Sequence, residues 1–114
     1  VFKKQNSDFT ILKNMIGYIQ KFHREKITLN DIALSGSVGQ SKCCKLFDKY
    51  IGMTPNAYLI QYRLHQSTWY LKNTDMTVTE IAHAVGFSGS SYYAEVFRKR
   101  CNQSPTEYRK SKRA

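Results

Sequence analysis

The side chains of this chain that could take part in chemistry are mostly cations. Lys and Arg number 18 against 8 Asp and Glu, which gives a formal net charge of +10 at pH 7. Such an excess favours a polyanionic partner, with nucleic acid first and an anionic membrane surface second. A cationic surface that serves only solubility is the other interpretation.

The cysteines and histidines do not form a catalytic or metal-binding pattern. Cys43 and Cys44 are adjacent and Cys101 makes the count odd, so neither a CxxC pair nor a Cys/His ligand set is present. This usage is typical of a reducing compartment and predicts a cytoplasmic protein. A GxxxxGK loop, an HExxH motif and a serine elbow are also absent, so we expect no enzymatic activity and no cofactor. No apolar run approaches the ~20 residues of a membrane span, so we expect no membrane partner.

The elements that must position the cations come in two related sets. Three segments recur 49 or 50 residues later with similar residue types. They are Leu29–Ala33 with Val78–Ala82, Leu46–Lys49 with Val96–Lys99, and Pro55–Tyr58 with Pro105–Tyr108. Two copies of one small unit predict one task performed twice, and they are too few for a solenoid.

Apolar spacing and cap residues predict three helices in the first half. Their expected bounds are about 8–24 after Asn6 or Ser7, about 29–35 after Thr28 or Asn30, and about 40–50. The expected apolar stripe on the first helix consists of Phe9, Leu12, Ile16 and Ile19, widened by Met15 and Phe22. On the third helix it consists of Cys43, Leu46, Phe47 and Tyr50. Gly52 is placed to end the third helix in a left-handed conformation.

A longer helix is expected from Pro55, with Thr54 as its N-cap, to about Leu71. It carries two stripes, one of Ala57, Ile60, Leu64, Ser67 and Leu71, and one of Tyr58, Tyr62, His65 and Trp69. A helix with two such sides packs against two bodies, so we expect it to connect the two halves. About 18 residues make it ~27 Å long.

The second half repeats the pattern of the first. We expect helices at about 78–84 after Thr77, at about 90–100, and at 105–108 after Ser104, followed by a basic, frayed tail over 109–114. The fold class is therefore all-α, with about seven helices. The expected division is a first subdomain over 1–53, a connector over 54–73 and a second subdomain with the tail over 74–114.

Each half contains a short helix, a turn that bears Gly and a second amphipathic helix, which is the pattern of a helix-turn-helix motif. Ala33 and Ala82 are placed where the two helices of each motif cross and only a small side chain fits. Gly86 lies where the turn is expected to need a positive φ. The second helix of such a motif enters a DNA major groove. Two copies on a chain of charge +10 predict double-stranded DNA as the partner.

The second half carries the signature Ile81-Ala82-x-x-Val85-Gly86-Phe87-Ser88, then Ser91-Tyr92-Tyr93-x-x-x-Phe97-Arg98-Lys99, then Ser104-Pro105-x-x-Tyr108-Arg109. Looser matches in the first half are Ile32-Ala33, Leu46-Phe47, Gly52-x-Thr54-Pro55-x-x-Tyr58 and Arg63-Leu64. Through these residues the chain, from about Phe9 to Arg109, resembles the AraC/XylS-type bacterial transcription regulators. It departs from the family where Cys43 replaces a usual leucine, Asn102 a usual glycine, Glu95 an often basic residue, and Gly39 and Gly89 the frequent Ser or Asp caps.

The resemblance implies a two-lobed domain whose two recognition helices read successive major-groove segments and so regulate transcription. On the helix over 40–50, the side chains expected to face bases are Gln40, Ser41, Cys44 and Lys45, and those expected to meet phosphates are Lys42 and Lys49. On the helix over 90–100, the base-facing set is Ser90, Ser91, Ala94 and Glu95, with Tyr92 and Arg98 toward phosphates.

Alternatives stay open for these residues. The lysines could form a solvated face, the two serines could act only as caps, and Tyr92 could lie partly in the core. Arg63, which matches a family arginine, is expected to form a structural ion pair with Glu80 or Asp31 rather than to contact DNA.

Two other functions also stay open: a non-specific nucleic-acid or nucleoid binder, and a basic protein–protein or membrane-surface module. RNA polymerase is a second candidate partner. We expect this chain to be a monomer, and we expect any dimerisation or sensing by a parent protein to come from a region outside it.

Overall fold

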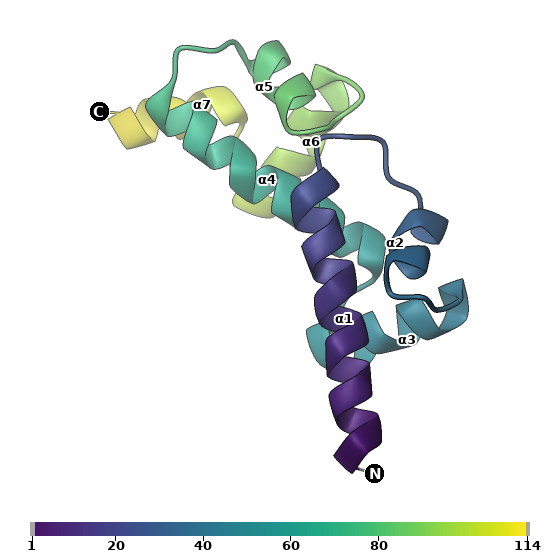
Figure 1. Cartoon of the computed structure of the whole chain (residues 1–114). Helices are drawn as coiled ribbons and strands as arrows, with labels where there is room; N and C mark the ends of the chain where they lie inside the picture. The colour runs from purple at the N-terminus through teal and green to yellow at the C-terminus, as the bar shows by residue number, and fades with distance from the viewer. Residues whose placement is uncertain (1, 114) are drawn as a thin grey trace. The chain divides into compact units, whose positions relative to one another are not determined.

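The computed structural model describes the backbone of residues 2–113 and the side chains of residues 7–113. Its helices are α1 (Phe2–Phe22), α2 (Leu29–Ser35), α3 (Gln40–Ile51), α4 (Pro55–Asn73), α5 (Val78–Ala84), α6 (Ser90–Cys101) and α7 (Pro105–Arg113) (Figure 1). No strand occurs in the described range, which confirms the all-α fold class. The chain divides into two compact units, residues 1–60 and 61–114, and α4 contributes to both.

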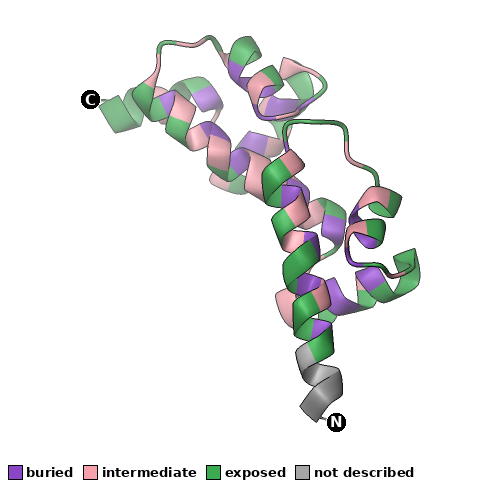
Figure 2. Cartoon of the chain, viewed as in Figure 1, coloured by how far each residue is buried: buried purple, intermediate pink, exposed green. Residues whose placement is uncertain are grey.

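The first unit has one apolar core, to which all its helices contribute. The buried members are Leu12, Met15 and Ile19 from α1, Ile32 and Ala33 from α2, Cys43, Leu46 and Phe47 from α3, and Leu59 from α4. Buried and exposed positions alternate along each helix at helical spacing (Figure 2). The apolar stripe expected on the third helix is therefore confirmed at Cys43, Leu46 and Phe47, while Tyr50 packs at the edge of the core.

A glycine lets α1 approach the end of α2. A Cβ added to Gly36, the C-cap of α2, would lie 2.8 Å from Cγ of Met15 and 3.0 Å from Cγ2 of Ile11. Both distances are shorter than normal carbon–carbon contacts, so a larger residue would push the two elements apart. Gly36 therefore sets how closely the first helix packs on the motif.

The second unit repeats this core. Its buried members are Leu64, Ser67 and Leu71 from α4, Ile81 and Ala82 from α5, Val85 and Phe87 from the turn, and Tyr93 and Phe97 from α6. Equivalent ring pairs join the second helix of each motif to the helix that follows: the centroids of Phe47 and Tyr58 are 5.9 Å apart, and those of Phe97 and Tyr108 are 5.5 Å apart. The alignment of the two halves is thus confirmed, with both phenylalanines completely buried.

The second stripe expected on the connector is confirmed only in part: Tyr58 packs against the first core and Tyr62 is half-buried, but its other two residues are not buried. Trp69 is 57% exposed and His65 is exposed, whereas Leu59, outside both expected stripes, is buried. Tyrosine and tryptophan satisfied the helical spacing, but their polar atoms and size also suit a surface position. Phe9, expected in the buried stripe of the first helix, is likewise 56% exposed.

Cap residues fix most helix starts. Thr28 with Asp31 and Thr77 with Glu80 form reciprocal capping boxes at α2 and α5, in which each threonine hydroxyl accepts from the third helical amide at 3.1 Å. Hydrogen bonds from the backbone and side chain of Thr77 lower the pKa of the Glu80 carboxyl. The Thr54 hydroxyl accepts from the amide of Ala57 at 3.0 Å, which confirms the expected cap of α4.

Two helix ends differ from the expectation. α1 begins at Phe2, so the start near Asp8 with a cap at Asn6 or Ser7 is wrong, and Ser7 lies inside the helix. α7 continues to Arg113, so the frayed tail after Tyr108 is also wrong. Both extra segments consist mostly of polar residues. A helix is predicted from the periodic spacing of its apolar residues, and these segments contain too few of them to show such a spacing.

Candidate nucleic-acid interface

The outer face of α3 is polar and cationic. Cys43, Leu46 and Phe47 turn into the core, and Tyr50 and Ile51 pack at its edge. Of the other side chains of the helix, Cys44 is half-buried and the rest are exposed. Of the residues expected to contact DNA, five are exposed and Cys44 is half-buried; the five are Gln40, Ser41, Lys42, Lys45 and Lys49. The Nζ of Lys49 lies 5.2 Å from the ring centroid of Tyr50, which favours an ordered position for this cation.

A hollow of about 510 Å³ opens beside α3 and is lined by Asp8, Gly39, Ser41, Lys42, Lys45, Leu46 and Lys49. Three of these residues are lysines, and Asp8 is the one carboxylate among them. The Nζ of Lys42 lies 3.6 Å from Oδ1 of Asp8. Sequence reasoning missed this ion pair because its partners are far apart in the chain and lie on different helices.

Both recognition helices begin without a side-chain cap. The N-caps of α3 and α6 are Gly39 and Gly89, and neither helix has a side-chain cap hydrogen bond. The first amides of each helix therefore keep donors available for an anion. The alternative that Ser90 and Ser91 serve as N-caps is wrong, because Gly89 holds the cap position and both serines are helical.

Around its centre, the outer face of α6 carries less positive charge than the outer face of α3. Ser91, Tyr92, Glu95 and Arg98 are exposed, while Ser90 and Ala94 are half-buried. A second hollow, of about 520 Å³, is lined by Ala94, Glu95, Arg98, Lys99 and Ser104. The expected contact residues thus share one helix in each unit, but α6 presents a carboxylate where α3 presents lysines.

An aromatic cluster supports the start of α6. The ring of Phe87 lies 5.9 Å from that of Tyr92 and 5.1 Å from that of Tyr93, measured between centroids. Tyr92 is still 47% exposed, so it packs on the core edge and also faces solvent. The guanidinium of Arg63 lies 6.0 Å from the Phe87 centroid, and burial lowers its pKa. The ion pair expected for Arg63 stays a prediction.

Sequence reasoning also missed the role of α7. Arg109 donates from Nε to the carbonyl of Leu71 at 3.1 Å and from Nη2 to that of Thr74 at 3.2 Å. Arg113 donates to the carbonyls of Lys72 and Thr74 and pairs with Asp75 at 3.0 Å. These arginines satisfy carbonyls at the C-terminal end of α4, where the helix itself supplies no donors. Their i, i+4 spacing after the Ser104–Glu107 capping box was the available signal.

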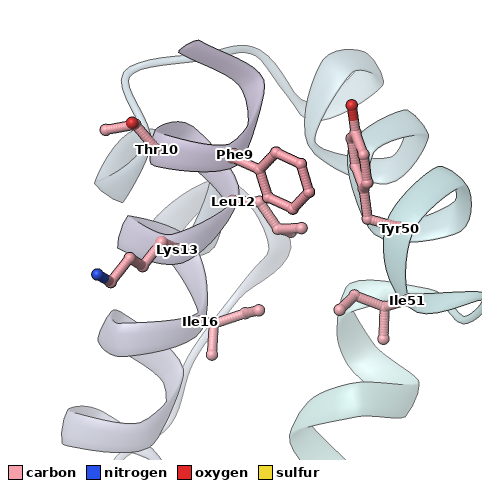
Figure 3. A pocket seen from close by; sticks show the side chains of 7 residues that line it. All are labelled: Phe9, Thr10, Leu12, Lys13, Ile16, Tyr50 and Ile51. Atoms are coloured by element: carbon pink, nitrogen blue, oxygen red, sulfur yellow. The ribbon is translucent and has the colours of Figure 1, made fainter. Parts of the chain in front are cut away.

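A further hollow in the first unit, of about 470 Å³ and mostly apolar, lies between α1 and the end of α3. Figure 3 shows Phe9, Leu12 and Ile16 facing Tyr50 and Ile51 across it, with Lys13 and Thr10 at its edge. The rings of Phe9 and Tyr50 lie 4.8 Å apart, which explains how an exposed phenylalanine is held.

Burial raises the pKa of the Cys43 thiol to about 11, so this group stays neutral and packs as a small apolar residue. Within the described residues, no cluster of three or more His, Cys, Asp or Glu side chains could hold a metal ion. None of the described helices is both long enough and apolar enough to cross a membrane.

Comparison with known proteins identifies relatives of this chain. The family profile for the helix-turn-helix domain matches residues 32–111. The chain is 36% identical over 99 residues to YdeC, an uncharacterized HTH-type transcriptional regulator of Bacillus subtilis, and the match covers 87% of this chain and 34% of the relative. The chain thus spans about a third of the length of the curated relatives it matches.

Two solved structures share the fold. One is an AraC-type transcriptional regulator from Chromobacterium violaceum, with a TM-score of 0.85 and 24% identity over 98% of this chain and 96% of that one. The other is the DNA-binding domain of AdpA in complex with a target DNA, with a TM-score of 0.85 and 24% identity over 90% and 92%. The chain therefore belongs to this family of helix-turn-helix domains, and its fold is that of the AraC-type DNA-binding domains.

Proposed function

We propose that this chain binds double-stranded DNA at specific sequences and thereby regulates transcription, with α3 and α6 as recognition helices in successive major-groove segments. One observation carries the proposal. In each unit the second helix of the motif buries one side in the core and leaves the other side exposed and polar. The net charge of +10 supplies the attraction to phosphates.

The two helices have different compositions, and this supports different roles for them. On α3, Gln40, Ser41, Cys44 and Lys45 face bases, and Lys42 and Lys49 meet phosphates. On α6, Ser90, Ser91, Ala94 and Glu95 face bases, and Tyr92 and Arg98 meet phosphates. Lysine donates to guanine and glutamine pairs with adenine, whereas a glutamate accepts from cytosine and repels phosphates. We therefore assign more of the base-specific free energy to α3 and more of the positioning to α6.

Relatives and structural neighbours give independent support. The names of the relatives describe transcriptional regulators, and one neighbour was solved on its target DNA. Contact with RNA polymerase stays a prediction from the family resemblance. The non-specific alternative needs only the charge and not the arrangement of polar residues on one helix face.

Selection of binding sites from random duplex DNA tests the function. We expect one enriched sequence, and a mobility shift on it that survives an excess of unrelated competitor duplex. Binding that the competitor removes completely, with no enriched sequence, would favour the non-specific nucleoid function instead.

Lys45→Ala tests the recognition face. The substitution should cost ~1–3 kcal/mol of binding free energy on the selected site and relax the preference at one base pair, because a base contact is lost. Lys21→Ala, which removes an exposed lysine from α1, is the matched control and should leave base preference unchanged. Equal losses for Lys45→Ala on selected and random duplexes would make Lys45 a phosphate contact.

A further inference from the structure

The carboxylate of Asp8 lies in an unusual setting for a surface that attracts polyanions. Its side chain is only 12% exposed, and its Oδ1 atom is buried without a hydrogen-bond partner. It lines the hollow beside α3 together with Lys42, Lys45 and Lys49. A buried carboxylate oxygen without such a bond costs free energy unless nearby positive charge compensates it.

The compensating charge comes from Lys42. Its Nζ lies 3.6 Å from the orphaned oxygen, and its side chain is 49% exposed. This separation exceeds hydrogen-bond length, so Asp8 does not hold the ammonium group in one geometry. What Asp8 supplies to Lys42 is therefore a negative charge at short range.

The same hollow contains the start of α3, where Gly39 provides no side-chain cap. A phosphate that approached Lys42 and the free amides of this helix would meet the Asp8 carboxylate there. Like charges this close repel, and the lysine can neutralise only one of them fully.

We propose that Asp8 restrains the phosphate affinity of the α3 face by neutralising Lys42. This inference rests on the proposed DNA-binding function and adds to it a residue from α1, outside both recognition helices. Asp8 sets how much of the charge of Lys42 is available to DNA, and the base-facing side chain of Lys45 is left unchanged.

A double-mutant cycle on the selected duplex tests the proposal, with the chain as wild type, Asp8→Asn, Lys42→Gln and both together. Asp8→Asn should tighten binding by roughly three- to tenfold near ~0.1 M salt and steepen the log–log salt dependence by up to ~0.9, the value for one more neutralised phosphate. In the Lys42→Gln background the same change should raise the affinity and the slope clearly less, because only the direct repulsion between Asp8 and phosphate is then relieved.

Two results would overturn the proposal. Weaker binding by Asp8→Asn would mean that Asp8 positions Lys42, and an equal gain in both backgrounds would mean that its charge acts without Lys42. Asp48→Asn is the matched control, because it removes an exposed carboxylate from α3 itself, outside the hollow. Its effect should be the same with and without Lys42. Asp8→Ser provides a second neutral variant if Asp8→Asn lowers the unfolding midpoint.

Immobilised heparin, a polyanion without base sequence, separates this inference from the proposed function. The salt concentration that elutes Asp8→Asn should exceed that for wild type, and the difference should shrink markedly when Lys42 is replaced. That result would support the restraint even if no duplex sequence were enriched. Identical elution of wild type and Asp8→Asn would reject it even if the chain binds a specific site.

Discussion

At the scale of single residues, the two motifs have different residue types at the same turn position, where the backbone adopts a positive φ. Ser37 and Gly86, 49 positions apart, both have positive φ in the turn, at 58° and 101°. The value for Ser37 lies in the left-handed well, which a non-glycine residue reaches at a modest cost. The value for Gly86 lies outside that well, where a Cβ is strained. The sequence predicted a positive φ for Gly86, but Ser37 gave no such signal because serine is common in any turn.

This difference predicts unequal responses to alanine. Gly86→Ala should lower the free energy of unfolding by ~1–3 kcal/mol, since alanine would have to hold a sparsely populated conformation. Ser37→Ala should stay within about 0.5 kcal/mol, because one side chain with a Cβ replaces another. Chemical denaturation of both variants beside wild type measures the contrast. Equal losses at the two positions would show that the turn conformations do not differ in strain.

The burial of single residues could be predicted where it depends only on the face of the helix on which the residue lies. The core positions of α3 and its exposed lysines both follow from the spacing of Cys43, Leu46 and Phe47. The pairing of Asp8 with Lys42 could not be predicted, because it depends on how α1 packs against α3. Local spacing contains no information about such a contact.

At the scale of elements, α1 in the first unit and α4 in the second unit contribute equivalent buried positions, but the residues at these positions differ in size. Their buried residues have the same spacing, Leu12, Met15 and Ile19 on α1 and Leu64, Ser67 and Leu71 on α4. Met15 packs over Gly36, the C-cap of α2, whereas the matching positions in the second unit are Ser67 and Val85, the C-cap of α5. The large residue is on the first helix in one unit and on the cap in the other. Each unit thus has one larger and one smaller residue at this pair of positions, and volume-conserving exchanges are the ones that cores tolerate best.

The starts of α2, α4 and α5 could be predicted from their threonine caps, and the ends of α3 and α6 from Gly52 and Asn102, which both have positive φ. The extent of α7 could not, because its stabilising contacts reach 35 to 41 residues back along the chain. A segment as polar as this one looks like a solvated tail when only its own residues are considered.

The contacts of α7 predict a stability effect at an apparently peripheral arginine. Arg109→Ala should lower the free energy of unfolding by ~1.5–3 kcal/mol, because charge-assisted hydrogen bonds to the carbonyls of Leu71 and Thr74 are lost. Lys110→Ala, an exposed neighbour, should change it by less than about 0.5 kcal/mol. Trp69, the single tryptophan, lies on α4 and can report the transition by fluorescence. If Arg109→Ala proved as mild as Lys110→Ala, α7 would not anchor α4.

At the scale of the whole molecule, the sequence repeat describes the function better than the net charge does. A charge of +10 fits any polyanion. Two helix-turn-helix cores, each with an exposed second helix, instead fit a DNA duplex that is read in two successive major-groove segments. The two outer faces differ, since α3 presents Lys42, Lys45 and Lys49 and α6 presents Glu95. One chain thus carries two recognition surfaces that are not copies of each other.

This asymmetry predicts the stoichiometry and symmetry of the DNA complex. A protein with one motif per chain dimerises to place two helices in adjacent grooves, and its site is palindromic. Here both helices belong to one chain, so a single copy should cover about two helical turns of DNA, and the selected site should lack an inverted repeat. Sedimentation of the chain with a short selected duplex measures the ratio, and a 1:1 complex is expected. A complex that forms only at 2:1 on an inverted repeat would contradict the arrangement, because each chain would then use a single recognition helix.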